Sequence, residues 1–140
     1  MKLFLDASVL LAACGRAEGG SRAVCDLAFA QGWRLLTSDY VMREVEKNVQ
    51  QRFPPAAQQE WQRLRPSLEV MRDVLTFDWP TVFPASKDRP VLFTAAATAD
   101  VLLTLDRADF GSVLGVGFYG LPVMKPGDFL RRERAAGRLV

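Results

Sequence analysis

The sequence of 140 residues contains no histidine, two cysteines and two tyrosines. Without histidine, catalysis by Ser-His-Asp or Cys-His groups is excluded, and so are metal sites with imidazole ligands. Two scattered cysteines, Cys14 and Cys25, form neither a disulfide framework nor a zinc site, so we expect both to be thiols in the core. Any catalysis by this chain has to use carboxylates, hydroxyls, amines or metal ions held by oxygen atoms.

Long apolar runs and a strong net charge are also missing. Asp6 interrupts the first apolar run, which disfavours a secretory signal, and no run reaches the length of a membrane span. Lysine and arginine total 18 against 16 acidic residues, a net charge of +2, so attraction to polyanions depends on local basic clusters. We expect a cytoplasmic protein without membrane association, folded as a single domain over residues 1–140.

Apolar runs alternate with helical patterns along the whole chain. The runs predict strands over residues 2–5, 33–37, 74–77, 101–105 and 121–124. The periodic segments predict helices over 7–13, 21–31, 39–52, 56–71 with a kink at Pro66, 89–99 and 126–136. Such alternation is typical of an α/β fold in which a mostly parallel sheet, here of four to five strands, is covered by helices on both faces.

Acidic side chains follow the predicted strands. Asp6 and Asp106 directly follow the first and fourth strands, and Asp88 lies after the third, at the start of the next helix. Glu44 lies less than two turns into the helix that follows the second strand. Because open parallel sheets bind ligands at the carboxyl ends of their strands, we expect these four acids to meet at one edge.

Several acidic positions also have structural explanations. Asp6 and Asp109 suit turns, and Asp88 suits the N-cap of the helix that it precedes. Glu44 and Glu46 lie at the two borders of one valine stripe, so helical periodicity does not distinguish them. We prefer Glu44 because it is nearer the end of the preceding strand.

Four carboxylates in one place repel one another unless a cation neutralises them. Mg²⁺ and Mn²⁺ prefer oxygen ligands, and two such ions about 4 Å apart can stabilise both the attacking and the leaving oxygen of a phosphodiester. Ser8 and Thr104, each two residues from an acid, can support the site by hydrogen bonds, and Ser8 equally suits a helix cap. Lys87 and Arg89, which flank Asp88, can hold a phosphate. The reaction that this set of residues suits best is phosphodiester hydrolysis.

Four segments in order, FLDASVLLAA, LLTSDYVMREV, KDRPVLFTAAATADVLLTLDRADF and GLPVMKPGDFL, resemble the successive motifs of the PIN-domain family. The resemblance implies a three-layer α/β/α nuclease, usually a ribonuclease, that uses Mg²⁺ or Mn²⁺. It also implies functional residues, namely an acidic quartet of Asp6, Glu44, Asp88 and Asp106, an accessory acid Asp109, and supporting hydroxyls of Ser8 and Thr104.

The resemblance also implies partners. Many bacterial and archaeal PIN proteins resemble VapC toxins, which a small antitoxin neutralises, and many form homodimers. The motif SKDRPVL is closer to another branch of the family than to the toxins, and segment 53–87 is longer and richer in proline than in a minimal toxin. Both features agree with a nuclease and count against the narrower toxin role. We therefore expect a metal-dependent ribonuclease that cleaves single-stranded RNA. The more specific hypothesis is that this ribonuclease is the toxin of a type II toxin–antitoxin pair.

Two alternatives belong to other functional classes. One is a PIN domain with weak or no catalysis that binds RNA or protein. The other is a phosphatase of the HAD type, which also has an aspartate at the end of its first strand. HAD chemistry needs a second aspartate two residues later, and this chain has Ser8 there.

Overall fold

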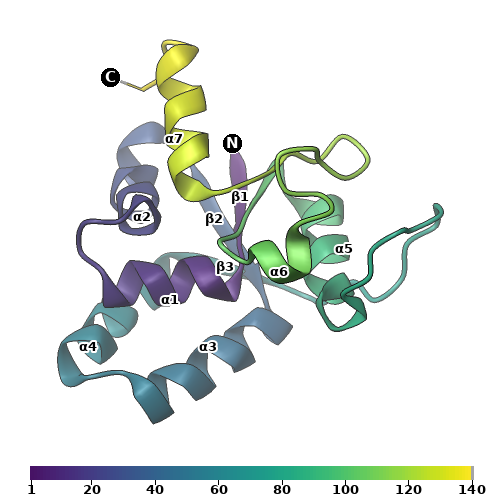
Figure 1. Cartoon of the computed structure of the whole chain (residues 1–140). Helices are drawn as coiled ribbons and strands as arrows, with labels where there is room; N and C mark the ends of the chain where they lie inside the picture. Colours follow the sequence, from purple (N-terminus) through teal and green to yellow (C-terminus); the bar gives the residue numbers. More distant parts are fainter. Residues whose placement is uncertain (140) are drawn as a thin grey trace.

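The computed structural model of the chain describes residues 1–139 and contains one five-stranded parallel sheet (Figure 1). The strand order is β3-β2-β1-β4-β5. The strands are β1 (Lys2–Leu5), β2 (Arg34–Ser38), β3 (Leu68–Met71), β4 (Val101–Leu103) and β5 (Val123–Met124). The helices are α1 (Ala7–Gly15), α2 (Gly20–Gln31), α3 (Asp39–Arg52), α4 (Pro55–Leu64), α5 (Arg89–Thr98), α6 (Arg107–Phe110) and α7 (Pro126–Ala135), with 3₁₀ turns η1 (Arg65–Ser67) and η2 (Ser86–Asp88).

Helices cover both faces of the sheet. The chain first builds β1, β2 and β3 toward one edge, then returns through α5 to place β4 and β5 on the other side of β1. Because parallel crossovers are right-handed, this reversal of direction puts α5 and α6 on the opposite face, whereas α7 packs against α2. Figure 1 shows α5 and α6 on one side of the sheet and α1, α2 and α4 on the other. The expected three-layer α/β/α fold is confirmed.

The two central strands position the site. Leu5 of β1 pairs with Leu103 of β4, and the side chains of both are fully buried. Strands buried on both faces are continuous apolar runs, as these are. The next backbone bond of the ladder runs from the Asp6 N–H to the Leu103 carbonyl at 3.1 Å. Asp6 and Thr104 therefore leave the sheet side by side, although 98 residues separate them.

The third strand differs from the prediction. Residues 74–77 are irregular, and β3 is Leu68–Met71, a segment that the sequence assigned to a kinked helix. Pro66 ends the helical conformation at η1, so the chain turns into a short strand beside β2. Residues 74–77 contact α5 instead, since Phe77 stacks on Phe93. β3 is an edge strand, and its Glu69 accepts two hydrogen bonds from the Arg34 guanidinium at 2.9 and 2.6 Å.

Helix α6 was not predicted, because four residues are too few for a periodic pattern. β4 ends at Leu103, two residues earlier than expected. The Asp106 side chain caps α6, accepting a hydrogen bond from the Asp109 N–H at 2.9 Å. The short helix therefore holds two acids of the predicted site in a fixed relation to each other.

The two cysteines are free thiols, Cys14 buried and Cys25 half-buried. Burial raises the pKa of Cys14 to about 11 and that of Cys25 to about 12, so neither is a ready nucleophile. Among residues 1–139, no helix has the length and apolar character needed to cross a bilayer.

Replacing Leu102 by alanine tests the packing of β4. Leu102 is fully buried, so L102A should lower the free energy of unfolding by about 2–5 kcal/mol. Leu75 is 68% exposed and provides the matched control, because L75A removes the same atoms with little change in burial. Urea denaturation measures both, and equal losses in the two variants would contradict this packing.

Candidate functional site: a cavity lined by carboxylates

A cavity of about 250 Å³ lies at the carboxyl end of the sheet. It is lined by Asp6, Ala7, Ser8, Leu11, Tyr40, Glu44, Asn48, Lys87, Asp88, Asp106 and Asp109. The five acids come from the end of β1, from α3, from the start of α5 and from α6. The structure thus brings together all the acids that the sequence singled out for a metal site.

Asp6 is the most enclosed of these acids, with 5% of its surface exposed. It occupies the N-cap position of α1, but its side chain makes no capping hydrogen bond. Its Oδ2 instead accepts hydrogen bonds from the hydroxyls of Thr104 at 2.8 Å and Ser8 at 3.0 Å. Burial raises the pKa of Asp6 to about 6, although both hydroxyls act in the opposite direction.

Backbone amides fix the orientation of these two hydroxyls. The Leu105 N–H donates to the Ser8 Oγ, and the Asp106 N–H donates to the Thr104 Oγ1, each at 3.0 Å. Each hydroxyl has only one proton, so accepting from an amide leaves that proton for Asp6. Oδ2 of Asp6 is therefore held by two donors, and Oδ1 is the oxygen left for another ligand.

Asp88, Asp106 and Asp109 each offer an oxygen within 4.8 Å of the others. Asp88 is 8% exposed, and its buried Oδ2 has no hydrogen-bond partner among residues 1–139. It stands at the N-cap position of α5 without a capping hydrogen bond from its side chain. The capping explanation from the sequence therefore does not account for this carboxylate.

Burial and the adjacent Asp109 carboxylate raise the pKa of Asp88 to about 8. The hydrogen bond to Asp88 and the Lys87 ammonium hold the pKa of Asp109 below its usual range. Two carboxylates this close resist ionising together, and a cation bound beside them would favour the ionised form of both.

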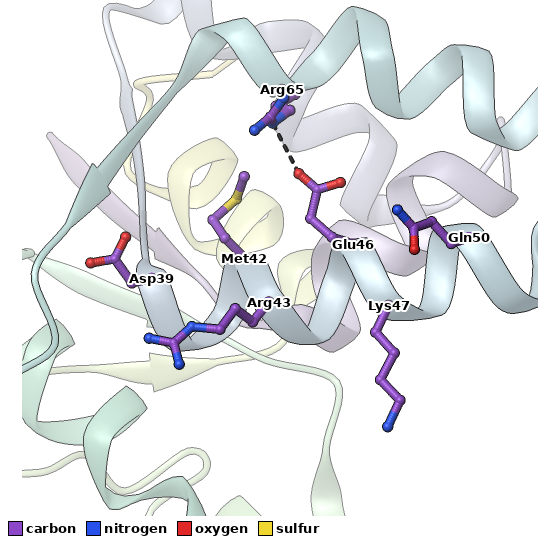
Figure 2. A pocket seen from close by; sticks show the side chains of 7 residues that line it. All are labelled: Asp39, Met42, Arg43, Glu46, Lys47, Gln50 and Arg65. Atoms are coloured by element: carbon purple, nitrogen blue, oxygen red, sulfur yellow. Dashed lines mark ion pairs between the residues drawn. The ribbon is translucent and has the colours of Figure 1, made fainter.

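Glu44 and Glu46, which helical periodicity did not distinguish, face different surroundings. Glu44 is exposed and lines the cavity with the other acids. Glu46 points to the other side of α3, where its Oε1 lies 3.0 Å from the Arg65 Nε (Figure 2). Its Oε2 accepts a hydrogen bond from the indole N–H of Trp61 at 3.3 Å. Glu46 thus joins α3 to α4 and η1.

The two basic residues beside Asp88 are already engaged. The Lys87 Nζ lies 3.3 Å from Asp109 Oδ2 within the cavity lining. Arg89 lies outside that lining, and its guanidinium donates to the Phe83 carbonyl at 3.1 and 3.4 Å. The structure brings Lys87 to the acids and directs Arg89 to the backbone of the preceding loop.

Two polar lining residues were missed from the sequence, Tyr40 and Asn48. They lie four residues before and four residues after Glu44, so the three share one face of α3. That spacing is the signal that could have identified them. At the opposite end of the sheet, Asp100 accepts a hydrogen bond from the Lys2 N–H at 2.7 Å and so links the starts of β1 and β4.

The donor set fits a hard divalent cation. The carboxylate ligands offer oxygen only, the type that Mg²⁺ and Mn²⁺ prefer. Asp88, Asp106 and Asp109 offer three oxygens that all lie within 4.8 Å of one another, so these three side chains would hold such an ion. The orphaned Asp88 Oδ2 is the observation that fits such an ion best, because a buried oxygen without a partner is costly.

No protein-family model matches the sequence, and no curated protein is significantly similar to it. Solved structures do match. The chain is similar to the crystal structure of VapBC2 from Rickettsia felis bound to promoter DNA, with a TM-score of 0.60 and 14% identity over 88% of this chain and 97% of that chain. It is also similar to PAE2754 from Pyrobaculum aerophilum, with a TM-score of 0.58 and 15% identity over 96% and 90% of the two chains.

These likenesses concern the fold. Both matches cover nearly the whole of each chain, and VapC proteins are PIN domains. They agree with the motifs quoted from the sequence, which lie on β1, α3, α5 with β4, and β5. Together the sheet topology, the helical layers and the matches establish that this chain has the PIN-domain fold.

Proposed function

We propose that the protein is a divalent-metal-dependent ribonuclease that hydrolyses phosphodiester bonds of single-stranded RNA. The observation that carries this proposal is the gathering of five carboxylates around one cavity, with a buried Asp88 oxygen that has no partner. Asp6, Glu44, Asp88 and Asp106 would hold Mg²⁺ or Mn²⁺, with Asp109 as an additional ligand. When bound, such an ion polarises the phosphoryl oxygen and lowers the pKa of water.

The protein side chains supply position and charge. Ser8 and Thr104 keep Oδ2 of Asp6 hydrogen-bonded, so Oδ1 is the oxygen that would bind the cation. The α6 cap keeps Asp106 and Asp109 together. Lys87 neutralises part of the charge of Asp109 and is the one lining residue with a cation to offer a phosphate.

A small antitoxin is the protein partner that we propose. The similarity to the Rickettsia felis VapBC2 structure supports this partner, and with it the toxin role within a type II toxin–antitoxin pair. A homodimer is part of the same proposal. The gene beside this one tests the toxin role, since an upstream gene for a short DNA-binding protein is expected.

Substituting the acids by their amides tests the reaction. D6N and D106N should each lower the rate of RNA cleavage in Mn²⁺ by on the order of 100-fold or more, because each removes one anionic ligand. Asparagine keeps the shape and can still accept the hydroxyl hydrogen bonds, so thermal unfolding should show a folded protein. Asp78 is exposed and lies outside the cavity, so D78N is the control, and full activity in D6N would refute the proposal.

Glu44 and Glu46 form a second matched pair on one helix. E44Q should impair cleavage and leave the melting temperature near that of the wild type, because Glu44 is exposed. E46Q should lower the melting temperature, because it loses the charge that pairs with Arg65. It should leave the cleavage rate near that of the wild type, because the acidic cavity is unchanged. Cleavage assays and thermal melts on both variants separate the roles, and a larger activity loss in E46Q would contradict the assignment.

The raised pKa values of Asp6 and Asp88 predict a pH dependence of stability in EDTA. Both values lie above 3.8, the ordinary value, so between about pH 5 and about pH 8 the folded state binds more protons than the unfolded state. The unfolding free energy should therefore fall as pH rises through that window, and D88N should flatten the dependence. Urea titrations at several pH values measure this, and a stability that increases with pH would contradict it.

A further inference from the structure

Arg43 and Lys47 are exposed cations on α3, four residues apart. Neither takes part in an ion pair within residues 1–139. Figure 2 shows the contrast with Arg65, which pairs with Glu46 while Lys47 points away from that pair. The charges of Arg43 and Lys47 are thus available to a ligand.

Helix geometry places both cations beside the acidic cavity. Arg43 follows Tyr40 by three residues, and Lys47 follows Glu44 by three. Residues three apart on a helix are neighbours, with Cβ atoms about 5–6 Å apart. Tyr40 and Glu44 line the cavity, so Arg43 and Lys47 form a row along its border.

An RNA strand needs cations at this border. Five carboxylates around the cavity repel a polyanion, and Lys87 already pairs with one of them. Arg89 is occupied by the Phe83 carbonyl. Arg43 offers a planar fork that matches phosphate, and Lys47 offers a point charge on a flexible stem.

The row also borders a second hollow, of about 500 Å³, between α3 and η1. Its lining comprises Asp39, Met42, Arg43, Glu46, Lys47, Gln50 and Arg65 (Figure 2). An RNA strand that leaves the acidic cavity past Arg43 and Lys47 can extend over this hollow, which offers both apolar and polar side chains.

We propose that Arg43 and Lys47 bind backbone phosphates of the RNA, so that the strand runs across α3 next to the cleaved bond. This inference rests on the proposed ribonuclease function. It assigns to α3 the role of holding the RNA backbone next to the bond that is cleaved. Because these contacts are to phosphate, they hold RNA of any sequence.

The test uses the double variant R43Q/K47Q and a fluorescein-labelled single-stranded RNA of mixed sequence. Anisotropy in EDTA measures binding against salt concentration, and cleavage in Mn²⁺ gives kcat and KM. Loss of two phosphate contacts should reduce the slope of log K against log salt by about 1.4, since each contact contributes about 0.7 for single strands. KM should rise while kcat is unchanged, because the contacts persist from substrate to transition state.

The matched control is R16Q/R134Q, which removes the same net charge from exposed arginines that line neither hollow. If the two double variants have equal slopes of log K against log salt and equal KM values, and both still cleave RNA, phosphate binding by Arg43 and Lys47 is refuted but the ribonuclease function is not. A wild-type protein that neither binds nor cleaves RNA would refute the row and the ribonuclease together. If R43Q/K47Q does not fold, K47Q alone carries the test, with an expected slope change of about 0.7.

Discussion

Repulsion among carboxylates is the constraint on which the arrangement of this site depends. Parallel pairing of β1 with β4 brings Asp6 beside the segment that carries Asp106, and the crossover through α5 adds Asp88. The backbone thus enforces a concentration of negative charge that the side chains alone would avoid. Two hydroxyl donors offset part of the cost at Asp6, whereas the Asp88 Oδ2 accepts no hydrogen bond from the part of the chain that the structure describes. A divalent cation is the simplest compensation, because its charge acts on every acid at once.

The hydroxyls of Ser8 and Thr104 connect the fold with the chemistry. Each accepts from a backbone amide just beyond β4 and donates to the acid just beyond β1. One hydrogen-bond network therefore fixes both the register of β1 against β4 and the orientation of the Asp6 carboxylate. Displacement of either strand would break several hydrogen bonds at once, so the precision of the site comes from the pairing of the sheet rather than from the loops around it.

The parts of the fold that the sequence predicted are those with strong local signals. The strands at 2–5 and 101–105 are continuous apolar runs, and each leads directly to an acid, so Asp6 and Asp106 could be placed at one edge. β3 could not be predicted, because Leu68–Met71 is short, half exposed and mixed in polarity, and only pairing with β2 makes it a strand. Glu44 and Glu46 have the same local pattern, and only Trp61 and Arg65, from a later part of the chain, separate them. The Phe83 carbonyl that occupies Arg89 likewise belongs to a loop without a pattern.

The ion pair between Arg34 and Glu69 has a consequence for how the molecule behaves in a crowded solution. β3 is the last strand on its side of the sheet, and its Val70 is 44% exposed. An open apolar edge invites another chain to add a strand and begin an aggregate, and charged side chains on short edge strands oppose this. β3 has only four residues, so it offers an incoming chain little backbone to pair with. Glu69, held by Arg34, would also have to lose water when another strand packed beside it. The β3 edge of the sheet is therefore a poor template for the addition of a strand from another chain.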